Sequence, residues 1–130
     1  MANAVLVDSC YFIDRLRADS DPFAELAAFD EHWEPVTCGM VMLEVLRGIR
    51  HEGDYARYRE TFAVMSCVAS TSRIWESATT LLRTLARRGY TIPPQDAIIA
   101  ASALAIGAPV LTFDQHFAMV PGLTVLSDLG

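Results

Sequence analysis

Short apolar segments alternate with helical patterns along the whole 130-residue chain, and this alternation limits the folds open to it. The segments are apolar at successive positions instead of every second one, which is typical of strands that helices cover on both sides. They are residues 4–7, 34–38, 66–69, 108–112 and 123–126. Strands that alternate with helices are joined by parallel crossovers. We therefore expect an α/β fold, with a parallel sheet of four to five short strands and helices on both faces.

The helical patterns between these segments have recognisable starts and ends. Asp21 followed by Pro22 is typical of an N-cap and a first-turn proline, and predicts a helix to about residue 32. Further helices are expected over about residues 39–50, 54–64, 74–88 and 95–106. The last of these is apolar nearly all round from Asp96, so we expect it to be deeply packed.

Composition favours one compact domain over residues 1–130. The hydrophobic fraction is 52% and the charged fraction is 20%, which is unlike a disordered chain. No apolar run is long enough to span a bilayer, and no signal peptide is recognisable, so we expect no membrane association. The three cysteines, Cys10, Cys38 and Cys67, are widely spaced and form no CxxC pair. We expect them to be reduced core residues of a cytoplasmic protein.

The charge balance restricts the partners of the chain. The formal net charge is −6, and all ten basic residues are arginines. An acidic domain is a poor general binder of phosphate backbones. Any nucleic-acid function must therefore depend on local charge and on metal ions, and a basic protein partner is equally natural.

Four carboxylates occur where strands end or where neighbouring helices begin. Asp8 directly follows the first apolar segment, and Asp114 follows the fourth, two residues after Thr112. Glu44 and Asp96 lie in the first two turns of two expected helices. Ligands of open α/β sheets bind beyond the carboxyl ends of the strands. We therefore expect Asp8, Glu44, Asp96 and Asp114 to converge at one edge of the sheet.

Each carboxylate also has a simpler structural explanation. Asp8 and Asp114 could cap short helices, and Asp96 could complement a helix dipole. For these three, capping is at least as good an explanation as chemistry when each is considered alone. Glu44 could pair with Arg47, three residues later, but the apolar residues on its side of the helix indicate a buried face. A surface ion pair therefore explains Glu44 less well.

Four converging carboxylates need cations. They would repel one another and raise each other's pKa values, so the cluster is stable at neutral pH only with positive charge in it. Oxygen ligands with no histidine or cysteine nearby suit Mg²⁺ or Mn²⁺. Two divalent ions would neutralise the four charges, although the number of ions cannot be obtained from the sequence.

Three stretches together resemble a known family. They are "VLVDSCYFIDRL", "MVMLEVLRGIR" and "LARRGYTIPPQDAIIAASALAIGAPVLTFDQHFAMVPGL", in this order. Together they resemble a PIN domain, and in particular the toxin ribonucleases of VapBC toxin–antitoxin modules. The resemblance covers nearly the whole chain, and the third stretch is its most specific part. It implies a three-layer α/β/α fold with strand order 3-2-1-4-5.

The resemblance also implies an activity and a site. The activity is Mg²⁺-dependent hydrolysis of RNA phosphodiester bonds, with Mn²⁺ as a plausible substitute. Asp8, Asp96 and Asp114 would be direct or water-mediated metal ligands, and Glu44 would be a ligand or would orient the attacking water. Two hydroxyl residues would support this site: Ser9, after the first aspartate, and Thr112, in the "TxD" pair.

The partners implied are RNA, an antitoxin with a basic segment over the acidic pocket, and a second copy of the chain in a homodimer. Arg15 and Arg47 could hold RNA phosphates, although a solvated helix face explains each of them better. His116 could contact substrate, although a surface position is the simpler explanation. The alternative function is a PIN-like interaction module without catalysis.

Overall fold

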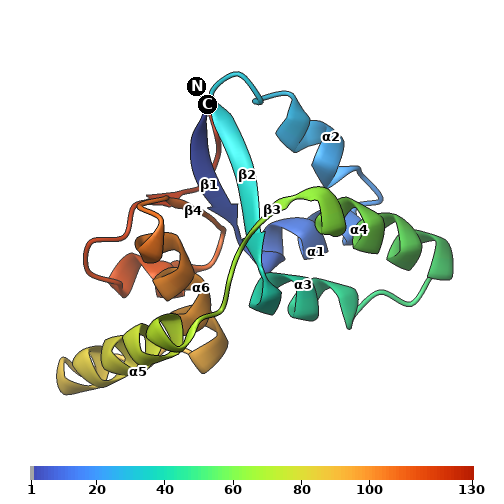
Figure 1. Ribbon diagram of the computed structural model, residues 1–130. Coiled ribbons are helices and arrows are strands. Elements are labelled where there is room, and N and C mark those ends of the chain that lie inside the picture. Colours follow the sequence, from blue (N-terminus) through green and yellow to red (C-terminus); the bar gives the residue numbers. More distant parts are fainter. Residues whose placement is uncertain (1) are drawn as a thin grey trace.

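The computed structural model describes residues 2–130 and contains a five-stranded parallel sheet of order β3-β2-β1-β4-β5 (Figure 1). This order confirms the expected topology. The strands are β1 Asn3–Val7, β2 Trp33–Cys38, β3 Ser66–Val68, β4 Val110–Leu111 and β5 Val125–Leu126. β1 lies at the centre and pairs with both β2 and β4. The residues that follow β1 and β4 therefore leave the sheet side by side.

Six α-helices and one short 3₁₀ helix connect the described strands. They are α1 Ser9–Arg17, α2 Pro22–Ala27, α3 Gly39–Leu46, α4 Glu52–Val64, α5 Ser72–Arg87, α6 Pro94–Ala105 and η1 Gln115–Met119. Figure 1 shows α1, α2 and α4 on one side of the sheet and α5 and α6 on the other. The expected arrangement, with helices on both faces of a parallel sheet, is confirmed.

Two helices are shorter than the sequence predicts. α2 was expected to reach about residue 32 but ends at Ala27, because residues 28–32 form turns with hydrogen bonds such as that from the Asp30 N–H to the Ala27 carbonyl. α3 was expected to reach about residue 50 but ends at Leu46. Gly48, a poor helix former, lies two residues beyond this end, after the C-cap Arg47, and its N–H bonds to the Val45 carbonyl in a tightened last turn.

The core differs on the two sides of the sheet. On one side, an aromatic cluster joins α1, α2 and α4: Phe12 and Phe62 pack edge to face at 5.1 Å, and Phe23 and Tyr58 do so at 5.0 Å. On the other side, α6 packs extensively against α5, and its buried face consists largely of small residues, Ala97, Ala100, Ala101, Ser102 and Ala103. The prediction that α6 is deeply packed is confirmed.

The cysteines match the expectation only in part. All three are free thiols, and Cys38 is buried. Cys67, however, is exposed, so the prediction of a core position was wrong for this residue. It lies on β3, a short strand at the edge of the sheet, where fewer elements can cover a side chain.

Within residues 2–130, no helix combines the length and the apolar character needed to cross a membrane.

Candidate metal centre

The end of β1 places Asp8 at the centre of the candidate site. Its side chain is only 3% exposed and caps α1, with Oδ1 accepting from the backbone N–H of Ser9 at 2.8 Å. The other oxygen, Oδ2, accepts from the hydroxyl of Thr112 at 2.8 Å. Capping and participation in the cluster are therefore not alternatives, because each uses a different oxygen of the same carboxylate.

The end of β4 adds the second aspartate. The Thr112 hydroxyl also accepts a hydrogen bond from the backbone N–H of Asp114 at 2.9 Å. Asp114 caps η1, with Oδ1 accepting from the backbone N–H of His116 at 2.9 Å. Thr112 thus fixes both the Asp8 carboxylate and the backbone that carries Asp114, as expected for two side chains on adjacent strand ends.

Glu44 reaches the cluster from α3. Its Oε1 accepts a hydrogen bond from the Ser9 hydroxyl at 3.2 Å, which ties α3 to the beginning of α1. Glu44 is half-buried, and among the described residues it forms no ion pair with Arg47 within 4 Å. A surface ion pair therefore does not account for its position.

Asp96 reaches the cluster from the first turn of α6, and a histidine lies against it. The imidazole Nδ1 of His116 is 2.9 Å from Asp96 Oδ2 and 3.1 Å from Asp114 Oδ1. One ligand atom from each of these three residues lies within 4.8 Å of the others. α6 and η1 lie directly before and after β4 in the chain, and they meet here through side chains that can all donate electron pairs.

The pKa shifts show that the acidic groups interact. Burial raises the pKa of Glu44, and the charges of Asp8 and Asp96 raise it further. Burial also raises the pKa of Asp96, with further contributions from Asp114 and Asp8, although the hydrogen bond to His116 opposes them. The structure thus brings the four predicted acids into one electrostatic group, in which positive charge is needed to stabilise the ionised forms.

The hydrogen bond to Asp96 raises the pKa of His116 above its usual value, and the neighbouring Asp114 adds to this effect. An imidazole between two carboxylates is stabilised in its charged form, since it supplies the positive charge that the cluster otherwise lacks.

Two residues near the cluster correct the expectation that no histidine or cysteine is close. Besides His116, Cys10 lies with its Sγ 3.2 Å from Asp8 Oδ2 and 3.3 Å from Thr112 Oγ1. Burial and the charge of Asp8 raise the pKa of this thiol to about 11, so it is neutral at physiological pH. Cys10 and His116 each lie two positions after a capping aspartate, Asp8 and Asp114 respectively. This spacing is the sequence pattern from which their proximity to the cluster could have been predicted.

The two arginines proposed for substrate contact lie in different surroundings. The guanidinium of Arg15 binds Asp14 at 2.7 Å and Glu25 at 3.0 Å, and it lies 4.3 Å from the centre of the Tyr11 ring. Arg47 is exposed at the end of α3, and among residues 2–130 it forms no ion pair within 4 Å. Arg47 is therefore the better placed of the two to meet a ligand of the site.

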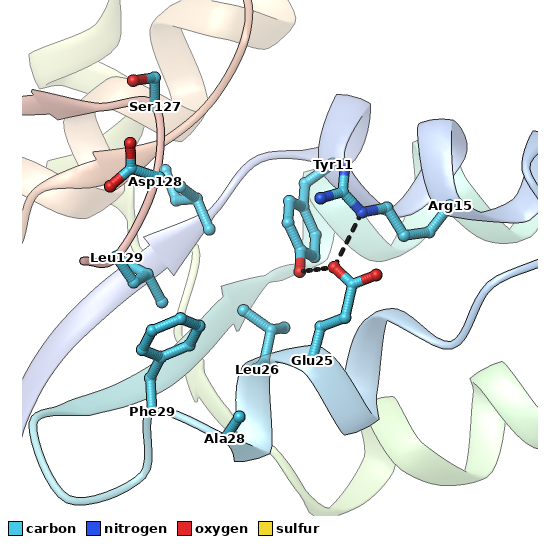
Figure 2. Close-up of a pocket in the computed structure, with 10 residues that line it drawn as sticks. Tyr11, Arg15, Glu25, Leu26, Ala28, Phe29, Ser127, Asp128 and Leu129 are labelled. Carbon is cyan, nitrogen blue, oxygen red and sulfur yellow. Dashed lines mark hydrogen bonds and ion pairs between the residues drawn. The ribbon is translucent and has the colours of Figure 1, made fainter.

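Figure 2 shows Arg15, Tyr11 and Glu25 beside a pocket. None of the four candidate carboxylates lines this pocket. The pocket has a volume of about 360 Å³, and its walls come from α1, the end of α2 and the C-terminal segment. The residues Leu26, Phe29 and Leu129 make much of this wall apolar. The ion pair between Arg15 and Glu25 therefore belongs to this pocket, and no hydrogen bond of the acidic site includes it.

The comparisons with known proteins agree with this geometry. A family model described as "PIN domain" matches residues 5–123, which is most of the chain.

The chain belongs to the PIN domain family.

Solved structures share the PIN fold at low sequence identity. A chain of the VapBC2 complex from Rickettsia felis, bound to a DNA fragment from its promoter, has a TM-score of 0.79 at 16% identity, over 94% of this chain and 96% of that one. For the DNA-bound VapBC of Salmonella typhimurium the TM-score is 0.79 at 18% identity, over 96% and 97% of the two chains.

A third structure is VapC20 of Mycobacterium tuberculosis, described as a toxin that cleaves the sarcin–ricin loop. Its TM-score is 0.65 at 16% identity, over 88% of this PIN domain and 92% of that chain. A search of curated proteins finds no significant match. At these identities the solved structures establish the shared fold, and the chemistry must be argued from the site itself.

Proposed function

We propose that this PIN domain, as a single unit of residues 1–130, is the toxin of a VapBC-type toxin–antitoxin pair and a Mg²⁺-dependent endoribonuclease. The observation that carries the proposal is the convergence of four carboxylates from four separate segments, two of them with raised pKa values. The similarity to chains of VapBC complexes and to a toxin that cleaves the sarcin–ricin loop supports the choice of substrate.

The residues of the cluster fit a divalent ion. Asp8, Asp96 and Asp114 offer hard carboxylate oxygens, and mutual repulsion within the group gives a bound cation a large electrostatic advantage. In our proposal these three hold the metal directly or through water. When bound, the metal lowers the pKa of a coordinated water and offsets negative charge on the transferred phosphoryl group.

The remaining residues orient the attacking water, the carboxylates and the RNA. Glu44 holds the attacking water through its carboxylate, and the Ser9 hydroxyl keeps that carboxylate turned toward the site. The Thr112 hydroxyl donates to Asp8 Oδ2 and so keeps this carboxylate in position. Arg47, exposed beside Glu44, would contact the RNA phosphates, whereas Arg15 is engaged with Glu25. The chain contributes no covalent nucleophile in this scheme.

The partners follow from the same site. An acidic pocket in a chain of net charge −6 suits an antitoxin segment rich in arginine or lysine. We further propose that the toxin forms a homodimer in the cytoplasm, where its RNA substrates and the antitoxin occur. A basic peptide that covers the carboxylates would exclude both metal and RNA.

The decisive experiment is cleavage of RNA by the purified chain, with the RNA ends mapped by sequencing. We expect cleavage in Mg²⁺ that EDTA abolishes and that Asp8→Asn reduces by at least about 100-fold, since a metal ligand is lost. Asp14→Asn is the matched control, because Asp14 lies exposed on α1 outside the cluster. Full activity of a folded Asp8→Asn variant would contradict the assignment.

The alternative, a PIN-like interaction module without catalysis, makes a different prediction. Such a module has no need of a metal, so calorimetric titration with Mn²⁺ should give no heat of specific binding. Binding that is lost in Asp8→Asn but kept in Asp14→Asn would favour the nuclease.

A further inference from the structure

His116 lies against two carboxylates of the acidic cluster, those of Asp96 and Asp114. Its backbone N–H donates to Asp114 Oδ1, which fixes the start of the side chain at the cluster. The ring is oriented so that its Nδ1 atom faces the carboxylates of Asp96 and Asp114. An imidazole nitrogen thus joins two carboxylates that come from α6 and from the end of β4.

The separations match the coordination of a small divalent ion. Nδ1 lies 2.9 Å from Asp96 Oδ2 and 3.1 Å from Asp114 Oδ1. In an octahedral complex with bonds of about 2.1 Å, neighbouring ligand atoms lie about 3 Å apart. One ion can therefore contact all three atoms after small movements of side chains that are not fully buried.

The ligand types determine which divalent ion binds more tightly. Mg²⁺ prefers carboxylate and water oxygens and keeps several of its waters, whereas Mn²⁺ accepts carboxylates and follows the general rise of affinity for nitrogen ligands across the first-row metals. A set of two carboxylates and one imidazole therefore favours Mn²⁺ over Mg²⁺.

We propose that His116 Nδ1 is a direct ligand of the divalent ion held by Asp96 and Asp114, and that it makes this site select Mn²⁺ over Mg²⁺. This inference rests on the proposed function and refines its metal: the site still accepts Mg²⁺ but binds Mn²⁺ more tightly. Binding exchanges the hydrogen bonds of Nδ1 for one bond to the ion, and any proton on Nδ1 is released to solvent. His116 is then a ligand and not only a positive counter-ion of the empty cluster.

Metal binding by the metal-free chain tests the proposal without any RNA. Calorimetry with Mn²⁺ and Mg²⁺ separately is expected to show tighter Mn²⁺ binding in the wild type. His116→Ala should weaken Mn²⁺ binding by about 10-fold or more but change Mg²⁺ binding much less, because loss of groups at a metal site costs about 10–100-fold. His116→Asp, which supplies oxygen in place of nitrogen, should keep Mn²⁺ binding and reduce the preference over Mg²⁺.

Pulsed electron paramagnetic resonance of bound Mn²⁺ provides a direct readout of the ligand. Nitrogen modulation of the spin echo is expected in the wild type and should disappear in His116→Ala. His51→Ala is the matched control, because His51 is exposed at the start of α4 and pairs with Asp54. This control should retain both the modulation and the affinity.

The outcomes separate this inference from the function on which it rests. Absence of any Mn²⁺ or Mg²⁺ binding would contradict the proposed nuclease itself. Binding that depends on Asp8 and Asp96 but is unchanged or tighter in His116→Ala, without nitrogen modulation in the wild type, would overturn only the role of His116 and leave it as a counter-ion.

Discussion

At the scale of single residues, Thr112 holds two of the four acidic segments in register. Its hydroxyl donates to Asp8 Oδ2 and accepts from the backbone N–H of Asp114, and the side chain is only 3% exposed. Asp8 Oδ2 has one further partner, the weakly donating thiol of Cys10, so the Thr112 hydroxyl provides its strongest hydrogen bond.

Replacing Thr112 by valine keeps the shape of the side chain but removes both hydrogen bonds. We expect Thr112→Val to lower the free energy of unfolding by about 1–3 kcal/mol, because the buried acceptor Asp8 Oδ2 and the backbone N–H of Asp114 both lose the hydroxyl that they share. Mn²⁺ affinity should fall by about 10–100-fold as Asp8 loses its orientation. Urea denaturation and calorimetry measure the two effects.

The control for this prediction is Thr79→Val on α5. The Thr79 hydroxyl also bonds to a backbone group, the Trp75 carbonyl at 2.9 Å, but in an exposed position. Its replacement should change stability by less than about 0.5 kcal/mol. Equal effects of the two substitutions would show that Thr112 has no special role at the site.

At the scale of elements, α6 positions Asp96 through close packing. The buried face of the helix consists largely of small side chains and packs against α5, and its first turn brings Asp96 near Asp8 and Asp114. The sequence predicted the burial of this helix from its nearly continuous apolar pattern. It did not predict the shortened ends of α2 and α3, because turn hydrogen bonds there compete closely with a further helical turn.

Enlarging one small residue of α6 should move Asp96. Ala100 is fully buried, so Ala100→Leu is expected to destabilise the fold by about 1–3 kcal/mol through overpacking and to weaken metal binding as the helix shifts outward. Ala105→Leu, at the exposed end of the same helix, is the matched control and should change neither. Thermal unfolding and Mn²⁺ titration of the two variants distinguish these outcomes.

At the scale of the whole molecule, the acidic cluster should make the stability of the metal-free protein depend on pH. The pKa values of Glu44 and Asp96 are raised, so the folded state binds more protons than the unfolded state between the unfolded and folded pKa values. The pKa of His116 is also raised, which gives the same sign at higher pH. The contribution of each group to the free energy of unfolding is therefore complete below its unfolded-state pKa. It is lost as pH rises through the folded-state pKa.

We expect the Tm of the metal-free protein to fall between about pH 5.5 and pH 8. The lowered pKa of Glu25 acts in the opposite direction, but only at more acidic pH. Saturating Mn²⁺ should raise the Tm most at pH 8, where the carboxylates are ionised. Scanning calorimetry across this range checks the prediction. In Glu44→Gln the Tm should depend less steeply on pH, because one titrating group is removed. A Tm that rises toward pH 8 without metal would contradict the prediction.

The sequence by itself determined the kind of fold and the candidate acids. Alternating strand and helix patterns require parallel crossovers, and parallel strands place their carboxyl ends at one edge, so Asp8 and Asp114 could be expected to lie near each other. Glu44 and Asp96, near the starts of two predicted helices, could be expected at the same edge, and the family resemblance added the strand order and the roles of the four acids.

Only the tertiary structure decided which neighbours complete the cluster. The contacts of His116 with Asp96, of Ser9 with Glu44, and of Cys10 with Thr112 join residues that are 20, 35 and 102 positions apart. Such contacts depend on how α6 and α3 pack against their neighbouring elements and on how η1 turns after β4. Local sequence patterns encode the elements, whereas these distances are set by packing between elements, which no short stretch of sequence contains.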